Sequence, residues 1–494
     1  MSIKKWLYSK KDTLLLLSII GLSIFLTFIN YPNRWGLAAD QARDVLVVHH
    51  ALALHTLPLI GPYSASGPFV FGPFWYWIFM IPIGLFPQIL LAPWIFQSIL
   101  YVGIIPLFYL IGRKLQNNNF GLLLSLFAAI SPGYITIATN LIMSALVGIM
   151  GVGILYFFID YLQTKKILSL SLLSFLVGLA INTHFEAAPL GIFLPAAFLV
   201  GKRNFKHVMA ICLLFLLPFL PLIIFTLQFH WYEITNILHT VFTPHAGAHL
   251  NPFFEFFKHW ATFLIIFLPK IWQQAIGGNT LIVFLAIALC LFTFLYAFYR
   301  QEVQKNILIL FIIFFVMSAP FGYYSGTLFE QFFTFAFPFL FIFITWTCLF
   351  LIQKQKIVGI FLIALFILFG LLCDGKIISS STNKTAQTAS YWTRQLDKAK
   401  LADTYKVYNF GTLNKNEGLA LAMLLSYQNK SSQKGLELGV GYVGAPIGYP
   451  ILINGPANLR IYNLGNTPPE QLQKEGFIPE NATNIYNSVE NWWK

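Results

Sequence analysis

Three charged residues, Asp40, Arg43 and Asp44, lie within five positions after the first long apolar run of the sequence. In a helix, Asp40 and Asp44 would lie one turn apart on one face, with Arg43 close to both. A carboxylate here could act as a general base toward a hydroxyl group, and the guanidinium could bind a phosphate. A structural interpretation is also open, in which Asp40 caps the helix, Arg43 pairs with it, and the helix rests on lipid headgroups.

The segment after this helix is rich in glycine and proline and could form the wall of a polar pocket. Gly-Pro pairs fix its turns, and the residues between them include Tyr63, Ser64 and Ser66. Backbone amides and Tyr63 would then meet a polar ligand at the membrane surface, although a re-entrant connector would show the same pattern. The pairs are Gly61-Pro62, Gly67-Pro68 and Gly72-Pro73.

Polar residues also occur at the ends of later apolar runs. His184 and Glu186 stand in "INTHFEAAP" (181–189), and an ionisable group at membrane depth suggests a functional site. Lys258 and Lys270 could neutralise a departing phosphate or simply anchor the chain at the interface. Glu330 follows a turn rich in aromatic residues and could help to close a pocket, or could be one solvated residue in an aromatic belt.

The sequence leaves metal dependence open. One acidic residue together with His184 could hold a divalent metal ion, or no ion is needed. His245 and His249 have a spacing found in metal sites, but Pro244 and Gly247 argue against the helix that would align them. The four cysteines are scattered singly without a CxxC pair, so neither a zinc site nor a disulfide framework is expected.

The composition places these residues in a membrane protein. Hydrophobic residues make up 57% and charged residues 10% of the 494 positions, and the mean hydropathy is +0.70. Soluble domains carry about 25% charged residues. The net charge of +13 does not indicate a nucleic-acid partner, because the charges cluster at the ends of apolar runs, where membrane lipids are the expected partners.

Apolar runs of about 20 residues predict eleven membrane spans. With a cytoplasmic N-terminus, the inner turns hold fifteen lysines and arginines, and the outer loops up to residue 373 hold four: Arg34, Arg43, Lys258 and Lys270. One missed span would place many of these basic residues on the other side of the membrane. We therefore expect a protein of the cell membrane with its N-terminus in the cytoplasm. The spans are expected near 13–30, 89–111, 119–137, 143–162, 167–182, 187–200, 208–228, 280–298, 307–324, 332–351 and 357–373.

Residues 69–86 are apolar but are not counted as a span, because counting them would invert every later loop. We expect a helix that dips into the outer leaflet, with Trp75, Tyr76 and Trp77 at the interface. The first outer loop would then run from about residue 31 to 88 and contain two helices at the membrane surface.

The composition becomes more polar after residue 373, which predicts a separate domain. We expect residues 1–373 to form the membrane domain, 374–390 a polar linker, and 391–494 a small α/β domain. Because the number of spans is odd, this domain would lie outside the cytoplasm. Its expected elements are a helix and a short strand at 390–410, a helix at 418–430, and two strands joined by a Gly-Pro turn at 449–465.

The order of these features resembles the GT-C superfamily of membrane glycosyltransferases, in particular the family-39-like branch that includes protein O-mannosyltransferases and aminoarabinose transferases. "AADQARD" (38–44) resembles the acidic first-loop motif of that branch, and "GPFWYW" (72–77) resembles its proline-aromatic element. "SPGYITIATNLIMSA" (131–145) resembles the next outer turn, where Asn140 or Ser144 takes the place of a second acidic residue.

The resemblance implies a GT-C-like membrane domain that transfers a sugar from a polyprenyl-phosphate donor to a glycan, lipid or protein acceptor at the outer face. Such a transfer needs a carboxylate base and cations for the departing phosphate, and Asp40 is the expected base. The expected substrate-binding residues are Arg43, Asp44, Tyr63, Asn140, His184, Glu186, Lys258, Lys270 and Glu330.

Two other functions remain open from the sequence. The chain could be a transporter or flippase for a lipid-linked or small solute, or a non-catalytic relative whose outer domain binds a partner. Transporters usually keep ionisable groups near the membrane midplane, whereas the acidic residues here lie almost entirely at the predicted outer turns. The sequence therefore favours the transferase.

Overall fold

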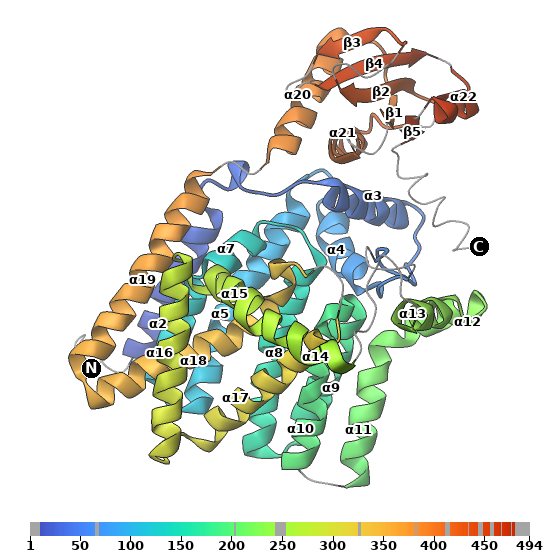
Figure 1. Ribbon diagram of the computed structural model, residues 1–494. Helices are drawn as coiled ribbons and strands as arrows, with labels where there is room; N and C mark the ends of the chain where they lie inside the picture. The colour runs from blue at the N-terminus through green and yellow to red at the C-terminus, as the bar shows by residue number, and fades with distance from the viewer. Residues whose placement is uncertain are drawn as a thin grey trace.

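The computed structural model describes residues 10–64, 69–201, 204–242, 253–324, 328–380, 383–410, 415–432, 434–442, 448–454, 459–465, 467–475 and 477–479. Within these residues the chain forms a large helical bundle, and a small sheet lies beyond one end of it (Figure 1).

Within the described residues, eight helical segments are long and apolar enough to cross a membrane, or nine if one bent pair counts as a span. The bent pair is α6 (Asn118–Ala129) and α7 (Pro132–Ala138), which meet at 56° where Pro132 begins a new helix. Two further apolar helical segments, α9 (Ile167–Thr183) and η2 (Phe185–Ile192) with α10 (Phe193–Val200), are shorter. Each of the eleven predicted spans falls on one of these elements, and the chain is a multi-pass membrane protein.

The eight longer segments follow the chain order of the predicted spans. They comprise α2 (Lys11–Phe28), α5 (Ala92–Leu115), α8 (Met143–Thr164), α11 (Phe205–Leu216) with η3 (Leu217–Phe219) and α12 (Leu220–Gln228), α16 (Thr280–Tyr299), α17 (Lys305–Ser318) with η5 (Ala319–Gly322), η6 (Glu330–Ala336) with α18 (Phe337–Lys354), and α19 (Lys356–Ser379). The remaining helical elements of the membrane part are η1 (Tyr31–Asn33), α3 (Ala39–Ala53), α4 (Phe74–Leu85), α13 (Tyr232–Phe242), α14 (Phe253–Thr262), η4 (Phe263–Phe267) and α15 (Leu268–Ile276).

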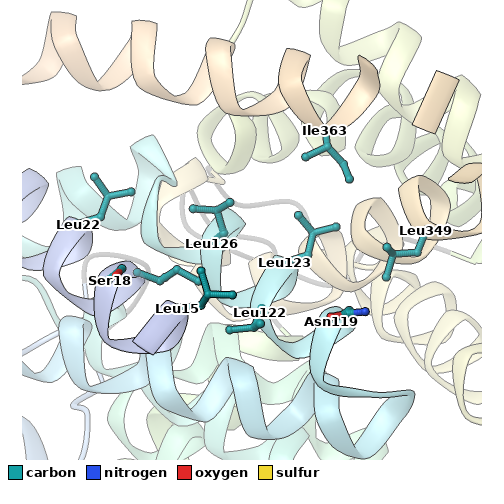
Figure 2. Close-up of a pocket in the computed structure, with 10 residues that line it drawn as sticks. Leu15, Ser18, Leu22, Asn119, Leu122, Leu123, Leu126, Leu349 and Ile363 are labelled. Atoms are coloured by element: carbon teal, nitrogen blue, oxygen red, sulfur yellow. The ribbon is translucent and has the colours of Figure 1, made fainter. Parts of the chain in front are cut away.

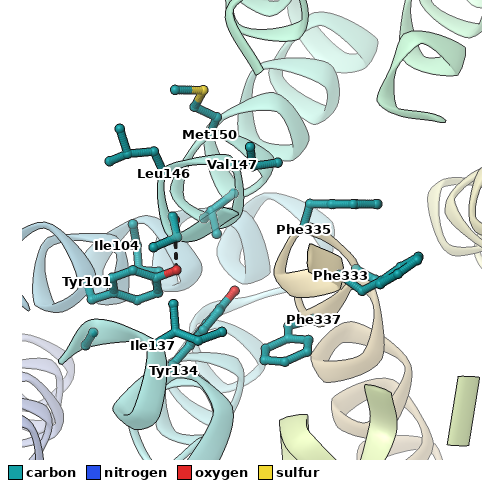
Figure 3. Packing of buried hydrophobic residues seen from close by; sticks show 14 of the residues in the cluster. Tyr101, Ile104, Tyr134, Ile137, Leu146, Val147, Met150, Phe333, Phe335 and Phe337 are labelled. Atoms are coloured by element: carbon teal, nitrogen blue, oxygen red, sulfur yellow. Dashed lines mark hydrogen bonds between the residues drawn. The ribbon is translucent and has the colours of Figure 1, made fainter. Parts of the chain in front are cut away.

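The core of the bundle forms where η6 packs against α8. Gly148 of α8 permits this close approach, because a Cβ atom at that position would lie 2.6 Å from Thr334 Oγ1. The Thr334 hydroxyl donates a 3.0 Å hydrogen bond to the Ser144 carbonyl. Figure 3 shows aromatic rings around this contact, among them Tyr101 and Phe337. The packing fixes the position of η6, the element that carries Glu330.

The segment predicted as the first outer loop, between α2 and α5, contains two α-helices, as expected. α3 lies across one end of the bundle, between α4 and the C-terminal domain (Figure 1). α4 is only 12 residues long and falls short of the span length. The apolar residues of α3 are buried on several of its faces, because both α4 and α21 pack against it, and this burial holds the helix in place. The buried apolar residues of α3 are Ala42, Val45, Leu46, Val47, Val48 and Ala51.

The C-terminal domain is a five-stranded sheet with helices. The strand order is β3-β4-β2-β1-β5, in which β1 and β2 are parallel and the other neighbours are antiparallel. The predicted helices and three of the strands are present, whereas β2, β5 and α22 were not expected. The elements are α20 (Lys384–Ala399), β1 (Tyr405–Phe410), α21 (Lys415–Tyr427), β2 (Leu436–Tyr442), β3 (Ile451–Asn454), β4 (Leu459–Gly465), α22 (Pro469–Lys474) and β5 (Phe477–Pro479).

Much of the expected linker, residues 374–390, is helical. α19 continues to Ser379 and α20 begins at Lys384, so few residues separate the two helices. Asn30 Nδ2 donates to the Ile378 carbonyl at 2.7 Å, and Asn383 Nδ2 donates to the Pro32 carbonyl at 2.6 Å. These bonds attach both sides of the junction to the start of the first outer loop. The polar composition here therefore marks tethered helix ends, and the exact division into domains stays a prediction.

The C-terminal domain packs on the bundle through α21, which contacts α3. The rings of His49 on α3 and Tyr427 on α21 meet edge to face with a centroid distance of 4.4 Å. Figure 1 shows α21 directly above α3. The domain therefore covers part of the helix that carries Asp40.

An apolar groove of about 460 Å³ lies between α2, α6, α18 and α19 (Figure 2). Apart from Ser18 and Asn119, its lining residues are all leucine and isoleucine. It involves the first half of α2 and the start of α6, away from the end of the bundle that carries α3. The polar chemistry that the sequence predicts therefore lies elsewhere.

Candidate active site at the α3 end of the bundle

Asp40, Arg43 and Asp44 form one ion-pair cluster on α3. Arg43 Nη1 lies 2.9 Å from Asp40 Oδ1, and Arg43 Nη2 lies 2.8 Å from Asp44 Oδ1. The Asp40 side chain is 76% exposed, whereas the Asp44 side chain is only 7% exposed. The two carboxylates thus share one guanidinium, and only Asp40 is open to a ligand.

A residue of α4 holds Asp44 in place. The Trp75 indole Nε1 donates a 2.7 Å hydrogen bond to Asp44 Oδ2. Burial raises the pKa of Asp44, while Arg43 and the Trp75 hydrogen bond oppose that shift. Burial would by itself lower the pKa of Arg43, but the Asp44 carboxylate raises it above the ordinary arginine value. The expectation that Trp75 lies at the membrane interface is wrong: its side chain is 1% exposed, because its indole serves a buried carboxylate.

Asp40 is not the cap of α3, contrary to the structural interpretation. Ala38 occupies the N-cap position. The Ala38 backbone N–H donates a 2.8 Å hydrogen bond to the Gln41 carboxamide oxygen. The Gln41 Nε2 donates to Asn140 Oδ1 at 3.2 Å. Asn140 therefore lies beside the start of α3, and Gln41 links this helix start to the turn between α7 and α8.

The Gly-Pro segment, which connects α3 to α4, forms a folded wall. Gly61 N donates to the Phe71 carbonyl at 2.7 Å, and Phe71 N donates to the Pro62 carbonyl at 3.0 Å. Tyr63 pairs with Val70 in an isolated bridge, and the Tyr63 side chain is partly exposed. Ser66 and the pair Gly67-Pro68 lie outside the described residues.

Glu233 on α13 stabilises this wall, and the sequence analysis missed it. Both carboxylate oxygens accept from the Val70 backbone N–H, at 3.0 and 3.1 Å, and Glu233 is only 2% exposed. Burial raises the pKa of Glu233 to about 7, against the lowering effect of that hydrogen bond. A small apolar cluster of Ile60, Val70, Leu222 and Phe225 adds to the contact. Glu233 is a single acidic residue in a long connecting segment, and its partner is a backbone amide. No sequence motif marks a backbone amide as a partner, so the sequence did not indicate this contact.

His184 and Glu186 come together at the end of α9. His184 Nδ1 lies 3.8 Å from Glu186 Oε2, and both side chains are largely buried. The His184 ring stacks on Phe71 of the wall at 4.7 Å and contacts the Phe332 ring of η6 at 4.8 Å. The turn therefore joins the Gly-Pro wall to η6.

Lys270 and Glu330 also form a pair, with Lys270 Nζ 3.4 Å from Glu330 Oε1. Because Glu330 begins η6, the pair lies on the same side of the site as Phe332. Lys258 is exposed on α14. Arg34, which the sequence offered as an outer cation, is buried and donates from Nη1 to the Leu26 carbonyl at the end of α2. It caps a helix and does not face a ligand.

Within the described residues, no group of three or more histidine, cysteine, aspartate or glutamate side chains could hold a metal ion. His245 and His249 lie outside these residues. His184 and Glu186 alone would supply two ligands, which is fewer than a structural metal site uses.

No model of a known protein family matches the sequence, and no curated protein matches it in a sequence search. Solved structures do match. ArnT from Cupriavidus metallidurans in the apo state superposes with a TM-score of 0.61 at 11% identity, covering 91% of this chain and 98% of ArnT. The same protein bound to undecaprenyl phosphate gives a TM-score of 0.60 at 12% identity, covering 93% of this chain and 98% of ArnT. This chain has the GT-C fold.

A weaker likeness, at a TM-score of 0.49 and 11% identity, links the chain to the oligosaccharyltransferase of Archaeoglobus fulgidus, over 86% of this chain and 65% of that protein. The GT-C fold agrees with the fold predicted from the sequence, including the outer-loop helices and the small C-terminal domain. At this level of identity the likeness concerns the fold.

Proposed function

We propose that this protein is a glycosyltransferase that moves a sugar from a polyprenyl-phosphate donor to a glycan, lipid or protein acceptor at the extracytoplasmic face. An acceptor hydroxyl oxygen attacks the anomeric carbon and forms the new bond, while the bond from that carbon to the phosphate oxygen breaks. The polyprenyl phosphate leaves with the electron pair, and the acceptor proton passes to the Asp40 carboxylate.

The arrangement of Asp40 with Arg43 and Asp44 carries this proposal. Trp75 and Arg43 hold the buried Asp44, and the same guanidinium holds Asp40 at 2.9 Å. The exposed Asp40 carboxylate is thereby fixed in direction and still open to an incoming hydroxyl group. A base must be positioned within hydrogen-bond reach of the proton it takes, and this cluster supplies such a position.

The donor phosphate needs a cation, and Lys270 is a better candidate than Arg43. The Arg43 nitrogens Nε, Nη1 and Nη2 already lie within 2.9 Å of carboxylate oxygens. Lys270 is 54% exposed, and its 3.4 Å contact with Glu330 is long for a charge-assisted hydrogen bond, so a phosphate can compete for it. Lys258 is the next candidate.

The GT-C fold supports this proposal, since ArnT has been solved with undecaprenyl phosphate bound. The distribution of basic residues between the two ends of the bundle also supports the proposed function. The connection between α16 and α17 carries Arg300 and Lys305 and lies at the end of the bundle opposite α3 (Figure 1), as the positive-inside rule requires if α3 faces outward.

The test is turnover of a labelled donor by the purified full-length protein. Undecaprenyl phosphate carrying a radiolabelled hexose is incubated with the protein and a lipid and glycan extract of cell envelopes. We expect sugar transfer by the wild type and a loss of at least 100-fold in Asp40→Asn, the scale of a lost general base. Asp403→Asn, an exposed aspartate of the C-terminal domain, serves as the matched control.

Full turnover in Asp40→Asn would remove Asp40 as the base. Protein-dependent movement of the labelled lipid across a vesicle bilayer without sugar transfer would instead favour the transporter. Donor binding without either activity would favour a non-catalytic relative.

A further inference from the structure

Three buried polar atoms at the end of α9 have no hydrogen-bond partner within the described residues. They are Asn182 Nδ2, Asn182 Oδ1 and Glu186 Oε2. Asn182 is fully buried, and Glu186 is 15% exposed. Buried polar groups are nearly always paired, so atoms left unpaired at one place call for a ligand or ordered water.

These groups lie between the Gly-Pro wall and η6. Gly72 N donates to the Asn182 carbonyl at 2.7 Å, which brings the wall against the end of α9. A Cβ atom on Gly72 would lie 1.7 Å from Asn182 Oδ1, so only glycine leaves space for the amide there. His184, two residues further, is flanked by the rings of Phe71 and Phe332.

The cluster offers hydrogen bonds without net charge. Burial lowers the pKa of His184 to about 4, so its imidazole is neutral near pH 7. Burial raises the pKa of Glu186 to about 8, so most of its carboxyl groups are protonated near pH 7. With the Asn182 amide, the three side chains combine donors and acceptors, and the cluster has no cation to neutralise a phosphate.

We propose that Asn182, Glu186 and His184 form a subsite for the hydroxyl groups of an uncharged sugar on the lipid-linked donor. Sugar hydroxyls donate and accept at once, which matches an amide, a carboxyl group and an imidazole. The neighbouring aromatic rings exclude water and provide apolar surface for the C–H groups of a sugar ring. The subsite rests on the proposed function, because it places the transferred sugar next to the wall while Lys270 meets the phosphate.

The experiment compares lipids that differ only in the sugar. Native mass spectrometry of the full-length protein in detergent gives dissociation constants for undecaprenyl phosphate alone and for undecaprenyl phosphate carrying glucose, mannose or galactose. A fifth lipid carries glucosamine, in which one hydroxyl of glucose is replaced by an amine. The variants are Asn182→Ala and Glu186→Leu.

The control is Thr183→Ala. Thr183 is as buried as Asn182 and adjacent to it, but its hydroxyl donates to the Leu179 carbonyl of its own helix at 2.8 Å. Melting temperatures of all variants show whether each one is folded. Glu186→Leu removes the carboxyl group from a side chain of similar size, so it tests the subsite even if Asn182→Ala disturbs the wall.

We expect the wild type to bind at least one neutral hexosyl lipid more tightly than undecaprenyl phosphate. Asn182→Ala should weaken that binding about tenfold, the scale of one lost hydrogen bond, and Glu186→Leu should also weaken it, because leucine offers neither a donor nor an acceptor. Both variants should bind undecaprenyl phosphate as the wild type does, and Thr183→Ala should change neither affinity.

Three outcomes overturn the subsite while leaving the donor class intact. In the first, the wild type binds all five lipids equally; in the second, the folded variants bind the hexosyl lipids as the wild type does. In the third, the wild type prefers the glucosamine lipid, which would mean that Glu186 acts as a carboxylate for a cation. Failure of every polyprenyl phosphate to bind the wild type would instead defeat the proposed function, and the subsite with it.

Discussion

The Trp75 indole donates a 2.7 Å hydrogen bond to the buried carboxylate of Asp44, and this bond connects the two helices of the first outer loop. Through Arg43 it also determines where the exposed Asp40 carboxylate lies. The position of the proposed base therefore depends on a tryptophan 35 residues away in the sequence.

Trp75→Phe should destabilise the protein by about 1–3 kcal/mol, because a buried carboxylate oxygen loses its donor. Transfer activity should fall as well, since Arg43 is no longer anchored. Thermal unfolding in detergent measures the first effect and donor turnover the second. Trp77→Phe is the control, because the Trp77 indole donates to the Pro58 carbonyl and does not touch Asp44. Equal losses in the two variants would contradict the role of the Trp75–Asp44 bond.

Asp40→Asn should mainly reduce turnover, whereas Asp44→Asn should mainly reduce stability. Asp40 is exposed, and an exposed ion pair contributes only about 0–1 kcal/mol, so Asp40→Asn should lose turnover and keep its stability. Asp44→Asn leaves the largely buried Arg43 without its main partner and should lower stability more than Asp40→Asn does. Urea or thermal unfolding of the two variants side by side checks this order. A larger stability loss in Asp40→Asn would be inconsistent with the observed burial.

Gly72→Ala should destabilise the protein by about 2 kcal/mol or more, because the new Cβ atom would lie 1.7 Å from Asn182 Oδ1 and the buried Asn182 amide must move. Gly84→Ala is the matched control within the same loop. Its Cβ atom would lie 3.7 Å from the Leu52 side chain, an ordinary contact, and alanine favours the helix α4. We expect Gly84→Ala to be neutral or slightly stabilising. Melting temperatures of the two variants measure the difference.

The stability that the buried Glu233 contributes should fall as the pH rises, because its ionised form is poorly solvated. The folded-state pKa of Glu233 is raised to about 7 from an ordinary value of 4.5, so the folded protein holds a proton that the unfolded chain releases. The stability from this group is therefore fully present below pH 4.5 and is lost as the pH rises through 7.

Glu233→Gln stays neutral at every pH and should remove that loss. The readouts are the melting temperature and hydrogen exchange of the Val70 amide from pH 5 to pH 8. Between these values the wild type should lose stability relative to Glu233→Gln, and the Val70 amide should lose protection only in the wild type, once the intrinsic pH dependence of exchange is subtracted. A constant difference between the two proteins across this range would contradict the prediction.

Lys270→Met should weaken binding of undecaprenyl phosphate several-fold, because a cation facing the phosphate is removed. Raising the salt concentration should reduce wild-type affinity and affect the variant less. Lys206→Met, an exposed lysine at the start of α11, serves as the control. Identical affinities and salt dependence in Lys270→Met and the wild type would exclude Lys270 as the phosphate ligand.

Much of the fold could be predicted because membrane insertion restricts the composition of each short stretch of sequence. Each span needs about 20 apolar residues, and the lysines and arginines gather on one side, so composition and charge predict the number and order of the segments. The same reasoning identified α3, α4 and the acidic cluster of the first outer loop. It placed Trp75 at the interface, because hydropathy cannot tell an indole facing lipid from one bonded to a buried carboxylate.

The sequence by itself determined that this is a multi-pass membrane protein with a charged cluster after its first span and a small domain at its C-terminal end. Only the tertiary structure decided which of these charges are available. It buried Asp44, left Asp40 exposed, used Arg34 as a helix cap and brought Glu233 to the amide of Val70. The physical reason is that burial and hydrogen-bond partners depend on segments far apart in the chain, whereas the sequence pattern reports only neighbours along it.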